Sequence, residues 1–234
     1  MKILGSICAR GGSKGIKNKN IRQLNNKPLI AYSIEALKAW GKADRIICST
    51  DSDEIQKVAR QYGAETPFKR PAKLATDTAG KLDVLKHIVN FCENQEKQKY
   101  DYIVDLDPTS PLRSIKDIDS AFNKILKSDA EVIFSVYEAH KNPYFNMVEL
   151  DDFGYAHLCK IHSKTIKARQ QAPKVYSLNA SIYIYQRDFL IKTSSLFAEK
   201  CIIHEMANYS IDIDNETDFL FVEFFIQKGG FKFD

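Results

Sequence analysis

The stretch KILGSICARGGSKGIKNKN, residues 2–20, joins a short apolar run to a loop rich in glycine and in cations. The apolar run at 3–9 ends in glycines, which is the pattern of a buried strand that leads into a loop. Glycines let the backbone approach an anion closely, and cationic side chains and backbone N–H groups bind phosphate. The stretch therefore predicts a polyphosphate-binding loop, with a solvated surface loop as the alternative. Its candidate residues are Arg10, Gly11, Gly12, Lys14, Gly15, Lys17 and Lys19.

This loop matches neither of the two commonest phosphate-binding patterns. The Walker pattern requires glycine directly before Lys and then Ser or Thr, whereas Ser13, Lys14 and Gly15 run in another order. The dinucleotide pattern GxGxxG is also missing. The ligand has to be inferred from the rest of the chain.

Outward from this loop, apolar strands alternate with helical patterns. Such repeated units predict an α/β fold with a parallel sheet, helices on both faces and functional loops at the carboxyl ends of the strands. A break in this rhythm at 140–174, with Asn-Pro, Asp-Asp and Phe-Gly turn signals, predicts a small β-rich excursion from a single domain that spans 1–234. The expected strands are 3–9, 45–50, 102–106, 131–136, 180–185 and 201–205, and the expected helices 28–40, 53–62, 78–93, 115–126 and 216–227.

Composition excludes several classes of protein. The 34 Lys and Arg against 30 Asp and Glu give a net charge of only +4, which argues against binding of nucleic acid through bulk charge. Five cysteines stand singly, without a CxxC pair, so we expect neither a disulfide framework nor a zinc site, and a reducing cytoplasm fits best. Arg10 interrupts the first apolar run too early for a signal peptide or a membrane span.

The segment SIDIDNETDF, 210–219, carries two alternating carboxylates. In an extended segment Asp212 and Asp214 point to one side while Ile211 and Ile213 point to the core. Two carboxylates beside a polyphosphate loop make a Mg²⁺ site, since this ion is held by one or two carboxylates and by substrate phosphates. The alternative, a helix N-terminal cap, is favoured for the residues that follow, Asn215 and Glu216.

The segment VDLDPTSPLR, 104–113, leaves a predicted strand at the edge where α/β sheets bind ligands. Asp107 is expected at the mouth of the site, with a cap role in a turn as the alternative. Arg70 and Arg169 each offer a guanidinium suited to a base, a phosphate or a carboxylate.

Taken together, the ordered motifs resemble those of the N-acylneuraminate cytidylyltransferases, the CMP-sialic acid synthetases, along nearly the whole chain. The motifs are ARGGSKGIKNKNI, STDSDEI, KRPAKLATDTA, DPTSPLR, ARQQAP with NASIYIY, and SIDID. The resemblance implies a Rossmann-like nucleotidyltransferase with a mostly parallel central sheet, which joins CTP to a nine-carbon 2-keto sugar acid, releases pyrophosphate and requires Mg²⁺. It also implies that the excursion at 140–174 exchanges contacts in a homodimer.

The resemblance assigns roles to individual residues. By it, the nucleotide is held by Arg10, Gly11, Gly12, Ser13, Lys14, Lys19 and Asn20, and Arg70 contacts the cytosine. Asp212 and Asp214 bind Mg²⁺ and, with Arg10, Lys14 and Lys19, form the catalytic set. The base that removes the anomeric proton stays open between Asp214 and a metal-bound hydroxide. The sugar acid is expected to contact Asp107, Thr109, Ser110, Arg169 and Asn179.

Two departures from the sialic acid enzymes bear on the substrate. Asp107 replaces the usual Gln, and Ser177 stands where a second arginine precedes Asn179. An ionised carboxylate accepts hydrogen bonds but cannot donate them, so it favours another substitution pattern on the sugar. The form DLDPTSPLR, with NPYFN at 142–146, looks most like the CMP-legionaminic acid synthetases. Legionaminic acid is therefore the predicted substrate, and N-acetylneuraminic acid, pseudaminic acid or a non-catalytic nucleotide-binding role are the alternatives.

Overall fold

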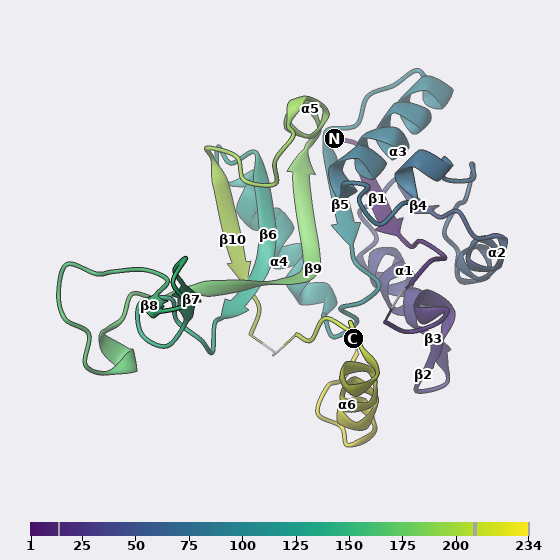
Figure 1. The fold of residues 1–234 in the computed structure, drawn as a ribbon. Helices are drawn as coiled ribbons and strands as arrows, with labels where there is room; N and C mark the ends of the chain where they lie inside the picture. Colours follow the sequence, from purple (N-terminus) through teal and green to yellow (C-terminus); the bar gives the residue numbers. More distant parts are fainter. Residues whose placement is uncertain (14, 208–209, 234) are drawn as a thin grey trace.

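The fold is built on a six-stranded sheet with the strand order β10-β6-β9-β5-β1-β4 (Figure 1). The computed structural model describes residues 1–13, 15–207 and 210–233. Strand β9 is antiparallel to both of its neighbours, and the other pairings are parallel. The sheet is thus mostly parallel, as expected. Its strands are β1 (Ile3–Cys8), β4 (Arg45–Ser49), β5 (Tyr102–Leu106), β6 (Val132–Glu138), β9 (Tyr176–Gln186) and β10 (Cys201–Glu205).

Helices cover both faces of this sheet. The apolar sides of α1, α2 and α4 pack on one face, and those of α3 and α5 pack on the other. Apolar area removed from water on both faces supplies most of the stability of such a three-layer fold. In the described residues the helices are α1 (Leu29–Trp40), α2 (Asp53–Tyr62), α3 (Lys81–Glu96), α4 (Ile115–Leu126), α5 (Arg187–Lys192) and α6 (Glu216–Gln227), and the 3-10 helices are η1 (Lys19–Ile21), η2 (Ala72–Leu74) and η3 (Arg169–Gln171).

A smaller apolar cluster fixes α6 beneath the carboxyl edge of the sheet (Figure 1). There Phe219 and Val222 of α6 pack with Leu29 and Tyr32 of α1 and with Ile213, which precedes α6. The two-stranded ribbon of β2 (Gln23–Leu24) and β3 (Lys27–Pro28) joins the same cluster through Leu24. This packing brings the last helix next to the first loop.

Residues 140–174, for which an excursion is predicted, lie between β6 and β9. This segment contains the antiparallel hairpin of β7 (Val148–Leu150) and β8 (Ala156–Leu158) and the short helix η3, and it projects away from the sheet beyond β9 (Figure 1). Apolar side chains on it are exposed to solvent, among them Phe153, Tyr155 and Ile161.

Local signals set several boundaries at the expected residues. The predicted bounds of α2, β5, α4, β10 and α6 are confirmed residue by residue. Ser52 caps α2, and Gly63, with φ of +98°, ends it in a left-handed conformation that glycine adopts without steric cost. Helix α3 starts three residues later than predicted, after Gly80. The short helix α5 and the ribbon of β2 and β3 were not predicted.

Candidate active site

The carboxyl edge of the sheet brings the sequence motifs together. The loops after β1 and β5 and the segment between β10 and α6 meet there around a cavity of about 330 Å³. This is the edge at which α/β sheets place their ligands. The cavity is lined by Cys8, Arg10, Ser13, Gly15, Lys19, Asn20, Asp107, Pro108, Thr109 and Asp214.

The first loop is held in place by its own backbone contacts. Gly11 donates its N–H to Asp51 Oδ1 at 2.8 Å, and the buried Asn20 donates from Nδ2 to the carbonyl of Arg10 at 3.0 Å. The Arg10 guanidinium forms an ion pair with Asp77 at 2.6 Å. A cation is thus already positioned at the cavity wall. Lys14, predicted to act here, lies outside the described residues.

Lys19 connects this loop to the carboxylate segment. Its Nζ donates to the carbonyl of Ile213 at 2.6 Å and lies 3.7 Å from Asp214 Oδ1. Gly15 contacts the same segment so closely that a Cβ there would lie 2.1 Å from the carbonyl oxygen of Asp214. The two motifs therefore form one site, although they come from opposite ends of the chain.

The two aspartates of the segment differ in exposure. Ile213 is buried and Ile211 packs beside it, as the alternation predicts. Asp214 is exposed, whereas Asp212 is half-buried and its Oδ1 is a buried oxygen without a hydrogen-bond partner. Burial raises the pKa of Asp212 above its ordinary value, although a hydrogen bond from Thr109 opposes the shift. Asn215 caps α6 in a reciprocal box with Asp218, which confirms the cap expected there.

The donor set fits a hard divalent cation that also binds phosphate. The unpartnered Oδ1 of Asp212 is a carboxylate oxygen in a position where a cation would satisfy it. No group of three or more His, Cys, Asp or Glu residues suited to a metal occurs within the part of the chain that the structure describes. One or two carboxylates therefore have to be completed by ligands such as substrate phosphates, which is typical of Mg²⁺.

The loop after β5 is fixed from behind by a buried arginine. Arg113 donates to Ser33 Oγ at 2.7 Å, to Ser181 Oγ at 2.9 Å and to the carbonyl of Ser110 at 2.5 Å, and it also donates to the carbonyl of Asp107. Burial lowers the pKa of Arg113 to about 10, against the opposing effect of nearby carboxylates. This guanidinium holds the loop that presents Asp107 to the cavity.

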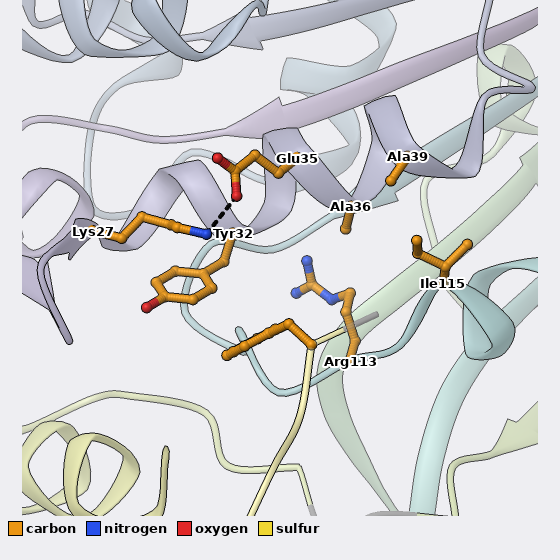
Figure 2. A pocket seen from close by; sticks show the side chains of 8 residues that line it. Lys27, Tyr32, Glu35, Ala36, Ala39, Arg113 and Ile115 are labelled. Atoms are coloured by element: carbon orange, nitrogen blue, oxygen red, sulfur yellow. Dashed lines mark hydrogen bonds and ion pairs between the residues drawn. The ribbon is translucent and has the colours of Figure 1, made fainter. Parts of the chain in front are cut away.

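A separate small cavity is lined in part by Arg113 (Figure 2). It measures about 120 Å³ and includes Glu35, whose carboxylate pairs with Lys27 at 2.6 Å. Its walls are side chains of α1 and of neighbouring segments, and Asp107 is not among them. It is therefore distinct from the cavity that contains Asp107. The lining residues are Lys27, Tyr32, Glu35, Ala36, Ala39, Arg113, Ile115 and Phe233.

Ser110 and Asn179, both predicted to bind substrate, are committed to internal hydrogen bonds. Ser110 Oγ donates to the carbonyl of Asn179 at 2.6 Å, and Asn179 Oδ1 accepts from Ser135 at 2.6 Å. Both residues are buried. Next to them, Ala180 has φ of +48°, at a register shift between β6 and β9. In this structure the pair shapes the wall behind the cavity.

Arg70 lines a second cavity of about 530 Å³, together with Asp51 and Lys69. Its guanidinium is buried and donates to Ser49 Oγ at 3.0 Å and to the Ser49 carbonyl at 2.5 Å. Asp51 also accepts from Gly11, so the first loop borders both cavities.

Among the predicted site residues that the structure describes, Arg169 lies apart from those of the first loop. It belongs to the excursion, where it lines a cavity of about 370 Å³ and donates to the carbonyl of Ala139 at 3.1 Å. Within one chain it therefore does not reach the residues of the first loop.

The site also contains a charged residue to which the sequence assigned no role. Lys81, the first residue of α3, lies between Asp105 and Asp107, and Asp105 also accepts from Ser6 Oγ at 2.7 Å. Burial raises the pKa of Asp107 against the opposing effect of Lys81. The signal in the sequence was a lysine at the start of a helix, where the helix dipole disfavours a cation.

Comparisons with known proteins agree with this fold. The chain is 43% identical over 228 residues to "Post-translational flagellin modification protein B" of Campylobacter coli, covering 97% of this chain and 96% of that protein. It is 43% identical over 226 residues to "CMP-N,N'-diacetyllegionaminic acid synthase" of Campylobacter jejuni, covering 96% of this chain and 95% of that protein. A solved structure of CMP:2-keto-3-deoxy-manno-octonic acid synthetase complexed with CTP shares the fold, with a TM-score of 0.72, 15% identity and coverage of 98% and 100%.

Among the described residues, no helix is both long and apolar enough to cross a membrane.

The cytidylyltransferase family model matches residues 5–222, nearly the whole length of the fold described above. The chain is therefore a member of the cytidylyltransferase family, and it is an enzyme of the nucleotidyltransferase class.

Proposed function

We propose that this enzyme joins CTP to a nonulosonic acid, with legionaminic acid as its substrate, and releases the CMP-sugar and pyrophosphate. The observation that supports this most strongly is the cavity in which the cationic loop, Asp107 and the carboxylate segment meet. The name of the Campylobacter jejuni relative adds support for the acid. N-acetylneuraminic and pseudaminic acids are the alternative substrates.

The chemistry is an in-line transfer of a nucleotidyl group. The anomeric hydroxyl of the acid gives its proton to a base, for which Asp214 is the candidate side chain, and its oxygen bonds to the α-phosphorus of CTP. The bond from that phosphorus to the bridging oxygen of the β-phosphate breaks, and pyrophosphate leaves. Catalysis of such a step depends mainly on positioning and on neutralising negative charge. Arg10 and Lys19 provide positive charge at the cavity wall. Gly11 and Gly12 keep the backbone beside them free of side chains.

We propose Asp212 and Asp214 as the residues that hold Mg²⁺. The unpartnered Asp212 Oδ1 and the exposed Asp214 carboxylate support this assignment. When bound, Mg²⁺ neutralises charge on the phosphates of the nucleotide. The role of Lys19 is then to fix this segment through the Ile213 carbonyl and to balance the charge of Asp214.

We also propose that the enzyme works as a homodimer in the cytoplasm. Phe153, Tyr155 and Ile161 of the excursion are exposed apolar side chains that a second copy would cover. Arg169 would then approach a partner's sugar-acid site. All five cysteines are free thiols, as is usual in a reducing compartment. Ile161→Asp should convert a dimer to a monomer in sedimentation velocity, whereas Leu126→Asp, at an exposed position on α4, should not.

Nucleotide choice tests the reaction itself. Purified protein with Mg²⁺ and nonulosonic acids should release pyrophosphate from CTP, and much less from ATP, GTP or UTP. Equal release from all four nucleotides would contradict the assignment of Arg70 and its cavity to the cytosine. No release from any nucleotide with any of the acids would favour the non-catalytic alternative.

A further inference from the structure

Lys81 occupies a position that helix formation alone does not favour. It is the first residue of α3, where the partial positive charge of the helix dipole repels a cation. No phosphate-binding role explains it either, because its Nζ is turned toward carboxylates. The side chain is only 30% exposed, so its charge is partly removed from water. Its partners have to account for its presence.

Those partners surround the ammonium group. Lys81 Nζ lies 2.7 Å from Asp105 Oδ2, 2.6 Å from Asp107 Oδ2 and 4.3 Å from the centre of the Tyr183 ring. An ammonium group has three N–H donors, and these two carboxylates and one aromatic face use them. Burial by itself lowers the pKa of Lys81, but the facing carboxylates outweigh it and raise this pKa well above its ordinary value. Lys81 is therefore a fixed cation without a donor to spare for a ligand.

The two carboxylates have different surroundings. Asp105 is completely buried, and its Oδ1 accepts from Ser6. Asp107 lines the cavity, and its Oδ2 accepts from Lys81 at 2.6 Å. Among the described residues no hydrogen bond is recorded for Asp107 Oδ1. This oxygen is thus the acceptor that the cluster leaves for a ligand.

We propose that Lys81 is a positioning residue for the sugar acid, which holds Asp107 through Oδ2 so that Oδ1 accepts a hydrogen bond from an N–H or O–H group of that substrate. This inference rests on the proposed function. Without Lys81, Asp105 and Asp107 would face each other as like charges beside an anionic substrate. Asp107 would then rotate or take up a proton, and the acceptor would be lost.

A double-mutant cycle on the acid kinetics tests this role. Lys81→Met and Asp107→Asn should each lower kcat/KM for the acid roughly 10- to 100-fold, the range for a hydrogen bond to a charged group. The KM for CTP should stay within about twofold in both variants, because the phosphates bind the first loop. Lys81→Met combined with Asp107→Asn should be no worse than Asp107→Asn alone, since Lys81 acts through Asp107.

Lys86→Met is the matched control. Lys86 lies on the same helix, is also half-buried and donates to the carbonyl of Thr193 at 2.6 Å, outside the cavity. The Lys86→Met variant should lose about as much free energy of unfolding as Lys81→Met, and its kcat/KM for the acid should equal that of the wild type. Losses that multiply in the double variant, or a CTP KM that rises as much as the acid KM, would overturn the proposal.

A spectroscopic readout separates this inference from the proposed function. In the free protein, the Lys81 ammonium should give a slowly exchanging ¹⁵N–¹H signal, because its protons are held by three partners. That signal should vanish in Lys81→Met, shift in Asp107→Asn and persist in Lys86→Met. An unshifted or missing signal would overturn the geometry, even if the enzyme turns over. The expected signals without turnover of any acid would instead contradict the proposed function alone.

Discussion

The α-hydrogen side of Gly15 faces the carbonyl oxygen of Asp214 so closely that a Cβ would lie 2.1 Å away from it. This contact joins the cationic loop to the carboxylate segment, and a real Cβ cannot occupy that distance. Glycine is needed here for the space. The contact therefore fixes how far the proposed metal ligands lie from the phosphate loop.

Gly15→Ala should separate these two motifs. We expect a loss of roughly 1–3 kcal/mol in the free energy of unfolding, which is typical of overpacking, together with a large fall in turnover. Gly12→Ala is the control for folding, because a Cβ at Gly12 meets nothing within 4 Å. Urea unfolding of both variants checks the difference. Equal stability of the two would mean that the loop moves freely relative to Asp214.

Removal of the metal should abolish turnover. Dialysis against EDTA is expected to stop pyrophosphate release, and Mg²⁺ should restore it. Asp212→Asn and Asp214→Asn should each lower turnover by at least about tenfold and raise the Mg²⁺ concentration required. Asp129→Asn, an exposed aspartate next to the amino end of β6, should behave as wild type. Intact turnover in both Asp212→Asn and Asp214→Asn would place the metal elsewhere.

Ala180→Gly should stabilise the fold. Ala180 has φ of +48°, a left-handed conformation that costs an alanine about 1 kcal/mol and a glycine almost nothing. The entropy of a glycine in the unfolded chain offsets part of this gain. Ala168→Gly, at φ of −143°, lacks the strain and should be neutral or destabilising. A thermal melt compares them, and a lower Tm for Ala180→Gly would contradict the strain argument.

Asp117 should contribute stability that depends on pH. Its carboxylate completes the capping box with Ser114 and lies 3.4 Å from His204 Nε2. Burial opposes ionisation, but the hydrogen bonds from His204 and Ser114 outweigh it and lower the pKa of Asp117 below 3.8. A lowered carboxyl pKa gives stability that is present above the ordinary value and lost as pH falls through the folded value.

The matching experiment compares wild type with Asp117→Asn at two pH values. At about pH 7 the variant should unfold with about 1 kcal/mol less free energy, the usual value of a cap. At about pH 3 the difference should shrink as the wild-type carboxylate is protonated. An equal difference at both pH values would assign the effect to packing and not to charge.

Local signals made much of the fold predictable. Ser52 and Gly63 bound α2, and Asn215 starts α6, because capping side chains and left-handed glycines act within a few residues. The antiparallel direction of β9 and the bulge beside Ala180 were not predicted, since they depend on pairing with distant strands.

In the candidate site, too, the features that lie within one continuous motif were predicted, and those that depend on contacts between distant elements were missed. The first loop, Asp107 and the carboxylate segment were readable because each motif is continuous in sequence. Lys81 was missed because its partners Asp105 and Asp107 lie on β5 and on the loop after it, and the contact depends on how α3 packs on the sheet. The internal use of Asn179 was missed for the same reason, since its partner Ser135 lies on β6.

The central claim is the choice of acid, and competition between acids tests it most directly. With CTP and Mg²⁺, kcat/KM should be clearly higher for legionaminic acid than for N-acetylneuraminic or pseudaminic acid, because Asp107 accepts hydrogen bonds where a glutamine would also donate one. A preference for N-acetylneuraminic acid or pseudaminic acid would contradict this account of Asp107.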